Sequence, residues 1–432
     1  MPVAVNQKKI SFYTLGCRLN QSETASIQNS FEANGYSVVD FEKPSDIVVI
    51  NTCTVTEGGD ADTRRLVNKV NRLNPGARIA LVGCQAQVQK EKLAELSNVR
   101  WIVGNQRKMD LVAVFNEYPD PQEPQVVAPT IEREPFVQET SSVDREHIRA
   151  NIKIQDGCDF FCSFCEIPYA RGRARSRVFD DIFVEAKALV AGGHKEIILT
   201  GINIGTYANE GKVLMDVIRQ LDAVEGLERI RISSIEPTTI PIELFDYMGQ
   251  GHKLCRYLHI PLQSGHDEIL AEMKRKYTTQ EFSDFILAAY QKVEEICIGT
   301  DVIVGFPGET DRHFDLTADL LRELPIHYFH VFSYSPRYMA KSRTLDNVSS
   351  ATITKRSAVL RDLSNRKRRI FHESLLGSAQ KVLFEEYKNG LWSGLTDHYV
   401  RVKIKSADNL LNKICSVQLN SVEGQHVYGE LQ

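Results

Sequence analysis

Strand-like and helix-like patterns alternate along most of this chain, and this alternation limits its possible folds more than any other feature. Before residue 117, the strand-like runs are KKISFYTLG, DIVVINT and RIALVG, with helical patterns between them. The alternation resumes after residue 146 and lasts for about six rounds, from IRANIKI to HYFHVFS. Strands that alternate with helices form βαβ units and parallel sheets. We therefore predict two α/β domains, a parallel sheet followed by a partial (β/α)6 barrel.

Two changes of pattern divide the 432 residues into three predicted domains. Residues 117–146 hold five prolines in a polar stretch without helical or strand periodicity, which is typical of an interdomain linker. From about Gly377, short alternating strands separated by turn residues indicate a small all-β module. The predicted domains are residues 1–116, 147–374 and 375–432.

Composition and charge exclude a few classes of protein. The hydrophobic content of 42% and the charged content of 25% are those of an ordinary globular protein. The N-terminus has no apolar signal region, and no run approaches the roughly 18 apolar residues that span a bilayer. We therefore expect a cytoplasmic location and no membrane partner. The net charge of -4 argues against general nucleic-acid affinity but leaves room for a local basic face.

Three cysteines in the first predicted domain occupy equivalent positions. Cys17 follows KKISFYTLG, Cys53 follows DIVVINT and Cys84 follows RIALVG. Parallel strands end at the same edge of a sheet, where ligands bind in open α/β folds, so the three thiols can meet at one point. A single cysteine there is most simply a small buried hydrophobic residue. Three together favour a shared metal or cluster site.

Three further cysteines stand close together in GCDFFCSFC, residues 157–165. The spacing of Cys158, Cys162 and Cys165 differs from the paired CxxC of a zinc finger, and no second pair of ligands is near in sequence. Thiolates suit zinc and iron-sulfur clusters, and a four-iron cluster held by three cysteines leaves one iron open. The spacing favours a cluster that binds a substrate or cofactor. A structural zinc or a chance grouping is the alternative.

Longer motifs add a resemblance to a known family. The stretch QDGCDFFCSFCEIPYARGRARSR, with Phe164 before its last cysteine, resembles the radical S-adenosylmethionine (SAM) enzymes. With TLGCRLNQSE, INTCTVT, LVGCQAQ, ILTGINIG, HIPLQSG and TDVIVGFPGET, the chain is identified as a member of the methylthiotransferases from about residue 9 to 430. That family combines a three-cysteine α/β domain, a radical SAM barrel and a small RNA-binding β-barrel called TRAM.

The first motif also points to a branch of this family. TLGCRLNQSE is most similar to the enzymes that act on N6-threonylcarbamoyladenosine beside the tRNA anticodon, at position 37. The isopentenyladenosine branch usually reads YGCQMN there, and the ribosomal-protein branch reads LGCPKN. Methylthiotransferases of those two branches, another radical SAM enzyme and a non-catalytic RNA-binding redox sensor are the alternatives.

The resemblance implies the cofactors and the reaction. It implies SAM and two 4Fe-4S clusters, one held by Cys17, Cys53 and Cys84 and the other by Cys158, Cys162 and Cys165. The implied reaction adds a methylthio group to carbon 2 of the modified adenine in a tRNA anticodon stem-loop. It also needs a reducing electron donor and a sulfur donor, which the sequence does not identify.

The resemblance further implies contacts to SAM at the ends of the barrel strands. The implied residues are Phe164, Gly201, Asn203, Ser234, Glu236, Gln263, Val304, Gly305 and Phe306. Glycines at these positions could equally serve turns after the strands. The stretch YSPRYMAKS departs from the Pro-Gly-Thr turn that is common in relatives after the sixth strand, so the geometry around Tyr338 is open.

Basic residues gather in two segments that we expect to bind RNA. Local density of positive charge matters more for phosphate contacts than net charge. A run of charge is also often just the solvated face of a helix. The expected RNA-binding residues are Arg171, Arg173, Arg175, Arg177, Arg366, Lys367, Arg368 and Arg369.

Overall fold

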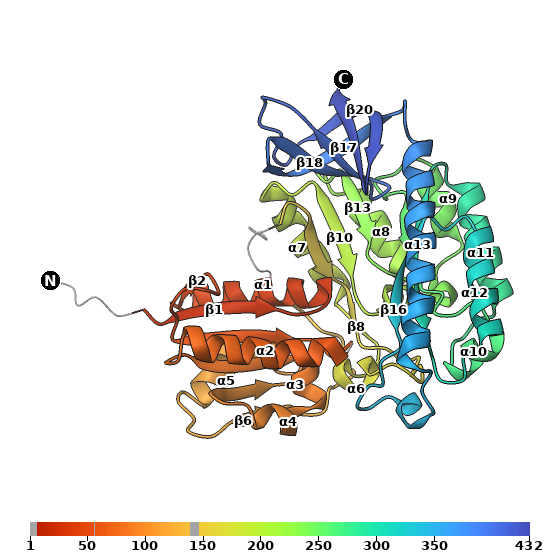
Figure 1. Cartoon of the computed structure of the whole chain (residues 1–432). Coiled ribbons are helices and arrows are strands. Elements are labelled where there is room, and N and C mark those ends of the chain that lie inside the picture. The colour runs from red at the N-terminus through yellow and green to blue at the C-terminus, as the bar shows by residue number, and fades with distance from the viewer. Residues whose placement is uncertain (1–6, 56, 139–146) are drawn as a thin grey trace.

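The computed structural model describes residues 7–55, 57–138 and 147–432, and it contains the three predicted parts (Figure 1). The N-terminal α/β part lies beside the central barrel, and the C-terminal β-barrel lies at one end of it. None of the helices in these ranges is long and apolar enough to cross a membrane. The architecture predicted from the alternation is confirmed.

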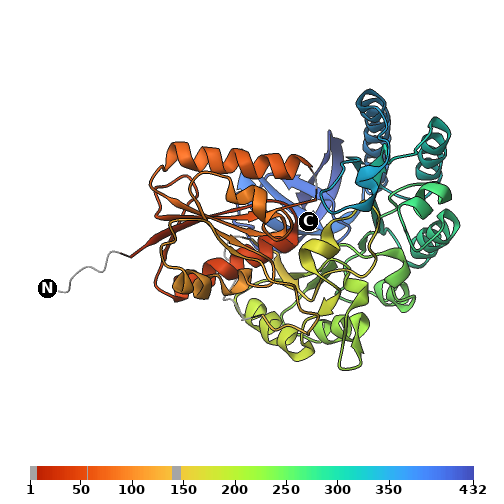
Figure 2. The ribbon, with the colours of Figure 1, turned by 90° about the horizontal axis from the view of Figure 1, so that it is seen from below.

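The N-terminal part is a doubly wound parallel sheet with strand order β2-β1-β3-β4-β5-β6. Its strands are β1 (Lys9–Thr14), β2 (Ser37–Val39), β3 (Ile47–Thr52), β4 (Arg78–Gly83), β5 (Val99–Val103) and β6 (Gln125–Val127). Its helices are α1 (Arg18–Ala33), α2 (Glu57–Leu73), α3 (Cys84–Val88), α4 (Lys90–Ala94), the 3-10 helix η1 (Lys108–Asp110) and α5 (Leu111–Glu117). Apolar residues of α1 and α5 pack on one face and those of α2, α3 and α4 on the other (Figure 2).

Strand β6 lies inside segment 117–146, where the sequence shows no strand pattern. It pairs in parallel with β5, with Trp101 opposite Gln125. Only backbone groups make this pairing, and the three residues are half-buried or exposed, so no alternation of side chains marks the strand. Residues 139–146 lie outside the described residues. The domain boundaries themselves stay a prediction.

The central part is a partial barrel of six parallel strands in two groups of three, β13-β10-β7 and β14-β15-β16. A bridge between Ile230 in β13 and Leu254, just before β14, joins the groups, and no pairing of the described strands joins β7 to β16. The six strands are β7 (Ala150–Lys153), β10 (Glu196–Thr200), β13 (Arg229–Ile232), β14 (Tyr257–His259), β15 (Cys297–Val304) and β16 (Tyr328–Ser333). Helix α1 of the N-terminal part contacts β7 at the open side.

Helices, with one exception, cover the outside of this barrel, and short elements form the loops between strands. The helices are α6 (Ile167–Arg171), α7 (Phe179–Ala191), α8 (Leu214–Asp222), α9 (Glu243–Gly249), α10 (Asp267–Glu272), α11 (Thr279–Lys292), α12 (Asp311–Glu323) and α13 (Ser350–Ser374). The short elements are β8 (Gln155–Asp156), β9 (Arg175–Ser176), η2 (Ile204–Thr206), β11 (Ala208–Asn209), β12 (Lys212–Val213), η3 (Pro237–Thr239) and η4 (Lys341–Thr344). Helix α6 is the exception, because it lies in the loop after β8 against α3 of the N-terminal part (Figure 1). Helix α13 runs along β16 toward the C-terminal part.

The C-terminal part is a closed barrel with strand order β17-β18-β19-β21-β20. Closure removes the free edges that would otherwise pair with other chains. Its core contains Val382, Phe384, Val402 and Val427. The strands are β17 (Ala379–Lys388), β18 (Leu391–Thr396), β19 (Arg401–Ile404), β20 (Ile414–Glu423) and β21 (His426–Leu431).

A buried ionic network joins the N-terminal part to the central barrel. Glu23 on α1 forms ion pairs with Lys108, Lys153 and Arg171, and Arg171 also pairs with Asp156 after β7. The distances are 2.8 Å from Lys153 Nζ and 3.0 Å from Arg171 Nη2 to the Glu23 carboxylate. Burial opposes ionisation of Glu23, but the three cations outweigh it and hold the pKa of Glu23 well below its usual range. The network fixes α1, and with it the first cysteine loop, against the barrel.

Candidate active site

All six cysteines of the two predicted triads line one cavity of about 600 Å³. The cavity lies where the carboxyl ends of the N-terminal strands face the barrel interior. Its wall also includes Tyr399, from the C-terminal barrel. Its other lining residues are Arg18, Leu19, Asn20, Val55, Phe160, Phe164, Ile167, Arg171, Thr200, Gly201, Ile202, Arg231, Ile232, Ser233, Ser234, Glu236, Tyr257, His259, Pro261, Gln263, Arg275, Asp301, Tyr328, His330 and Phe332.

The first triad is positioned as the sequence predicts, just beyond three parallel strands. Cys17 is the N-cap of α1, Cys53 follows β3 and Cys84 begins α3 after β4. Gly16 has a φ of +91°, and a Cβ there would lie 2.6 Å from the Sγ atom of Cys53. Only glycine leaves room for this sulfur beside the Cys17 loop.

The second triad lies in the loop between β8 and α6. The backbone N–H of Phe160 donates to the Sγ atom of Cys158 at 3.5 Å, and Arg275 Nη1 donates to that of Cys162 at 3.2 Å. Arg275 is also paired with Glu236. Burial raises the pKa of Glu236, against the opposing effect of Arg275. The arginine thus holds one cysteine and one predicted SAM contact in fixed positions.

The chemistry of the six thiols fits two iron-sulfur clusters. None of the nine cysteines is in a disulfide. Burial raises the pKa of Cys53 to about 11 and that of Cys158 to about 11, so these thiols stay protonated at neutral pH unless a cation displaces the proton. The thiols form two groups of three, and both groups face one cavity. Iron-sulfur clusters use such sets of thiolate donors.

Five of the nine predicted SAM contacts line the cavity, and four do not. Phe164, Gly201, Ser234, Glu236 and Gln263 line it. The side chain of Asn203 is buried outside the lining, where its Oδ1 accepts a hydrogen bond from Thr239 Oγ1 at 2.9 Å. The remaining three also lie outside the lining. Val304 ends β15 and packs in the barrel core, and the two residues that follow it, Gly305 and Phe306, pack against Ile353 and in a smaller apolar cluster.

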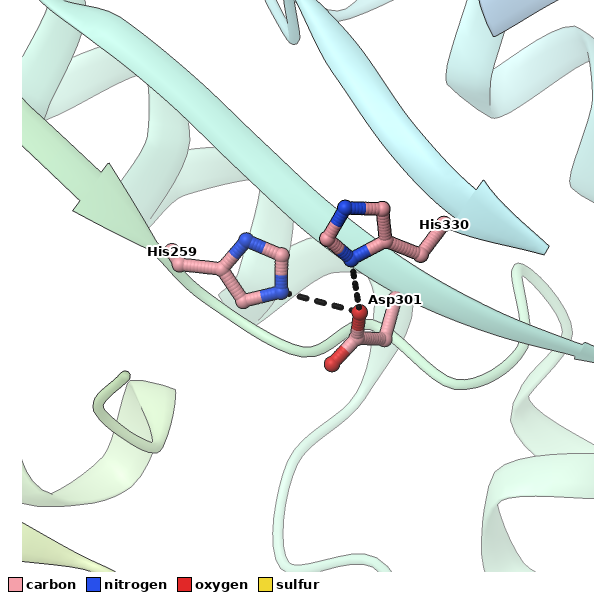
Figure 3. Close-up of side chains that lie close together, drawn as sticks. All are labelled: His259, Asp301 and His330. Carbon is pink, nitrogen blue, oxygen red and sulfur yellow. Dashed lines mark hydrogen bonds and ion pairs between the residues drawn. The ribbon is translucent and has the colours of Figure 1, made fainter. Parts of the chain in front are cut away.

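A carboxylate between two histidines forms a polar layer inside the barrel (Figure 3). Asp301 Oδ1 lies 2.9 Å from His259 Nε2 and 3.2 Å from His330 Nδ1. Burial opposes ionisation of Asp301, but the histidines outweigh it and keep its pKa below the usual range. The three side chains place metal-ligand atoms within 4.8 Å of one another, although these atoms already contact each other. In the sequence, their only signal was a histidine or an aspartate inside each of three apolar strands.

Arg171 and Arg177, two of the predicted RNA contacts, have buried side chains that are paired within the protein. Arg171 is part of the network around Glu23. Arg177 is paired with Asp181, at 2.5 Å, and with Glu185. In the segment ARGRARSR, the guanidinium groups of Arg171, Arg175 and Arg177 therefore balance carboxylates inside the protein.

The other six predicted RNA contacts differ in exposure. Arg175 is largely buried beside Asp156, at 3.2 Å, whereas the side chain of Arg173 is 56% exposed. On α13, the side chains of Arg366 and Arg369 are 62% and 67% exposed. Nζ of Lys367 donates to the backbone carbonyls of Arg322 and Leu324, at 3.0 and 2.8 Å. The side chain of Arg368 lies 4.9 Å from the centroid of the Tyr328 ring and donates to Gln425.

The loop YSPRYMAKS contains a residue that the sequence analysis missed. Arg337 is buried and pairs with Asp60 on α2 at 2.7 Å. It also lies 3.4 Å from Glu166, directly after Cys165, and 3.1 Å from Thr54 Oγ1, directly after Cys53. The arginine therefore connects the two cysteine loops to the loop after β16. Tyr338, by contrast, is 42% exposed.

Comparison with known proteins first defines the class. The radical SAM superfamily model matches residues 152–321, and the model of the uncharacterized protein family UPF0004 matches residues 9–104. A solved structure of the radical SAM methyltransferase TsrM from Kitasatospora setae, with cobalamin and a 4Fe-4S cluster bound, has a TM-score of 0.58 and 17% identity and covers 76% of this chain and 77% of its own. This likeness shows the fold alone. The chain is a radical SAM enzyme that binds SAM and a 4Fe-4S cluster.

Curated relatives then define the family. The threonylcarbamoyladenosine tRNA methylthiotransferase MtaB of Aquifex aeolicus is 39% identical, over 91% of this chain and 96% of its own length. The tRNA-2-methylthio-N(6)-dimethylallyladenosine synthase of Lachnoclostridium phytofermentans is 31% identical, over 97% and 94%. The chain therefore belongs to the radical SAM methylthiotransferase family, in the branch of the proteins named MtaB.

Proposed function

We propose that this protein adds a methylthio group to carbon 2 of N6-threonylcarbamoyladenosine at position 37 of tRNA. The observation that carries the proposal is the meeting of two cysteine triads, from separate parts of the chain, at one cavity. A single triad would suffice for a radical SAM enzyme. A second triad facing the same space suits a reaction that also needs a held sulfur atom.

The residues of the chain would position the cofactors and exclude water. Cys158, Cys162 and Cys165 would hold the radical SAM cluster, and Cys17, Cys53 and Cys84 a second cluster. When bound, these groups and SAM supply radical chemistry at an inert carbon–hydrogen bond and the sulfur to be transferred. The ion pair of Arg275 with Glu236 lies beside Cys162 and orients that side of the cavity.

Iron analysis tests the second cluster. We expect about eight irons per chain in anaerobically purified protein, and about four when either triad is replaced by alanine. Replacing Cys255 and Cys297, which are buried outside the cavity, is the matched control and should leave the iron content unchanged. An iron content near four in the unaltered protein would contradict the two-cluster assignment.

Nucleoside analysis tests the substrate. In a strain that lacks the gene, mass spectrometry of digested tRNA should show loss of methylthio-threonylcarbamoyladenosine, and the gene should restore it. Loss of methylthio-isopentenyladenosine instead would assign the chain the other tRNA activity. Unchanged tRNA nucleosides would point to a protein substrate. The anticodon stem-loop, the electron donor and the sulfur donor stay predictions until such assays identify them.

A further inference from the structure

Arg18 differs from every other cation that lines the cavity. Among the described residues, the lining arginines Arg171, Arg231 and Arg275 are paired with buried carboxylates. Both lining histidines contact Asp301. Arg18 is half-buried and donates to a tyrosine hydroxyl, and no carboxylate of the described residues lies within ion-pair distance of it. A positive charge therefore faces the cavity without a negative partner.

The C-terminal barrel holds Arg18 in place. Its Nη2 donates a hydrogen bond to the hydroxyl of Tyr399, and its guanidinium carbon lies 5.6 Å from the centroid of that ring. Tyr399 has a φ of +67°, a left-handed conformation that is uncommon for residues other than glycine. Its ring stacks on Tyr257 with centroids 4.7 Å apart. A guanidinium fixed by one hydrogen bond keeps further N–H donors for a ligand.

The surroundings of Arg18 leave the cavity side as the place for that ligand. The side chain also borders a second hollow of about 410 Å³. Two carboxylates line that hollow: Glu385, which is paired with Arg149 and Arg401, and the exposed Glu386. Their negative charge disfavours an anionic ligand on that side. Planar, bidentate recognition of a carboxylate is the interaction for which a guanidinium is best suited.

We propose that Arg18, oriented by Tyr399, binds the carboxylate of the threonylcarbamoyl group of the substrate and so selects acidic adenosine derivatives over neutral ones. This inference rests on the proposed function. In adenine, C2 and C6 are both bonded to N1, so the group on N6 lies on the same edge of the base as C2. Arg18 directly follows Cys17, so a base presenting C2 to the first triad brings its N6 substituent toward Arg18.

The test compares two stem-loop RNAs that differ only at this carboxylate. One carries N6-threonylcarbamoyladenosine at position 37 and the other its methyl ester. We expect the unaltered holoenzyme to prefer the acid by about tenfold to a hundredfold, both in Kd measured by fluorescence anisotropy and in kcat/KM, as a charge-assisted hydrogen bond predicts. In Arg18→Gln the two RNAs should become nearly equivalent. Arg18→Lys should keep part of the preference, because lysine keeps the positive charge but lacks the planar guanidinium that can donate two parallel hydrogen bonds to a carboxylate.

Controls separate this role from folding and from the proposed function. Arg65→Gln, at an exposed position on α2, should keep the full preference. Tyr399→Phe should reduce the preference without abolishing it, and it gives an independent test should Arg18→Gln fail to fold. Equal use of acid and ester by the unaltered enzyme, or an unchanged preference in Arg18→Gln, would overturn the inference alone. Modification of isopentenyladenosine RNA but of neither threonylcarbamoyl RNA would overturn the proposed function and the inference together.

Discussion

Glu23 illustrates how a motif residue can serve the architecture of a site without touching its chemistry. It lies six residues after Cys17, is fully buried and faces three cations from three different segments. A buried charge that loses its partners is costly, whereas the same charge in a complete network is tolerated. The glutamate of TLGCRLNQSE therefore anchors the N-terminal part on the barrel.

Replacing Glu23 by Gln should lower the free energy of unfolding by about 3–5 kcal/mol at pH 7, because three buried cations lose their counter-charge. Denaturant unfolding of the unaltered and altered proteins measures this difference. Glu42→Gln, which removes an exposed partner of Lys69, should have no measurable effect. Equal stability of Glu23→Gln and the unaltered protein would contradict the role of the network.

The difference in stability between Glu23→Gln and the unaltered protein should depend on pH. The pKa of Glu23 is lower in the folded than in the unfolded protein, so its stabilisation is complete above the unfolded pKa of about 4.3. It is lost as the pH falls through the folded pKa. The stability difference between the two proteins should therefore be constant from about pH 7 to 5 and shrink in more acidic solution.

Sequence alone predicts the cysteines far better than the arginines. Cys17, Cys53 and Cys84 are placed by a local rule, since each follows a strand of one parallel sheet. Whether an arginine is free depends on partners far along the chain. Arg171 pairs with Glu23, 148 residues away, whereas Arg18 donates a hydrogen bond to Tyr399, 381 residues away. No local pattern distinguishes these two environments.

At the scale of single elements, helix α13 carries both solvent-exposed charges and a charge that contacts the neighbouring segment. Its arginines at positions 366 and 369 form exposed ion pairs within the helix, with Asp362 and Glu373. Such pairs contribute little to stability. Lys367, one residue away, is held by two backbone carbonyls of the neighbouring segment.

If α13 contacts RNA phosphates, Arg366→Gln and Arg369→Gln should each lower the slope of log K against log salt concentration by about 0.9. Filter binding of tRNA at several salt concentrations measures this slope. Lys367→Gln is the matched change that should leave it unaltered. Identical slopes in all three variants would show that this face of α13 does not contact the backbone of RNA.

Elements that lack a side-chain pattern could not be predicted from the sequence. The alternation of strands and helices predicts both parallel sheets, because their strands are buried and apolar. Strand β6 shows no such alternation, and its backbone pairing with β5 depends on the finished sheet. The same holds for the loop after β16, whose geometry follows from Arg337 and its partners in other segments.

At the scale of the whole molecule, separate parts of the chain share the cavity and are tied together around it. Arg337 is one of these ties, since it links the barrel to Asp60 of the N-terminal part. Glu166 and Thr54, its other partners, each follow a cysteine of a different triad.

Replacing Arg337 by Gln should therefore loosen the N-terminal part locally. We expect amide hydrogen exchange in the first turns of α2 and in the loop after β16 to become at least about tenfold faster, because the half-buried Asp60 and the buried Glu166 lose a charged donor. Mass spectrometry of exchanged peptides measures this. Arg343→Gln, an exposed neighbour, is the control. Unchanged hydrogen exchange in Arg337→Gln would show that this arginine does not hold the N-terminal part against the barrel.

The contribution of Tyr399 to the cavity wall changes what the C-terminal barrel is for. A module that merely captured a nucleic acid could be exchanged or trimmed without altering the reaction chamber. Here the loop between β18 and β19 forms part of the wall of the reaction cavity. A chain that ended before this loop would lose part of the cavity wall as well as any affinity for nucleic acid that the barrel provides. A β-barrel taken from another protein would have to place an equivalent side chain at the position of Tyr399.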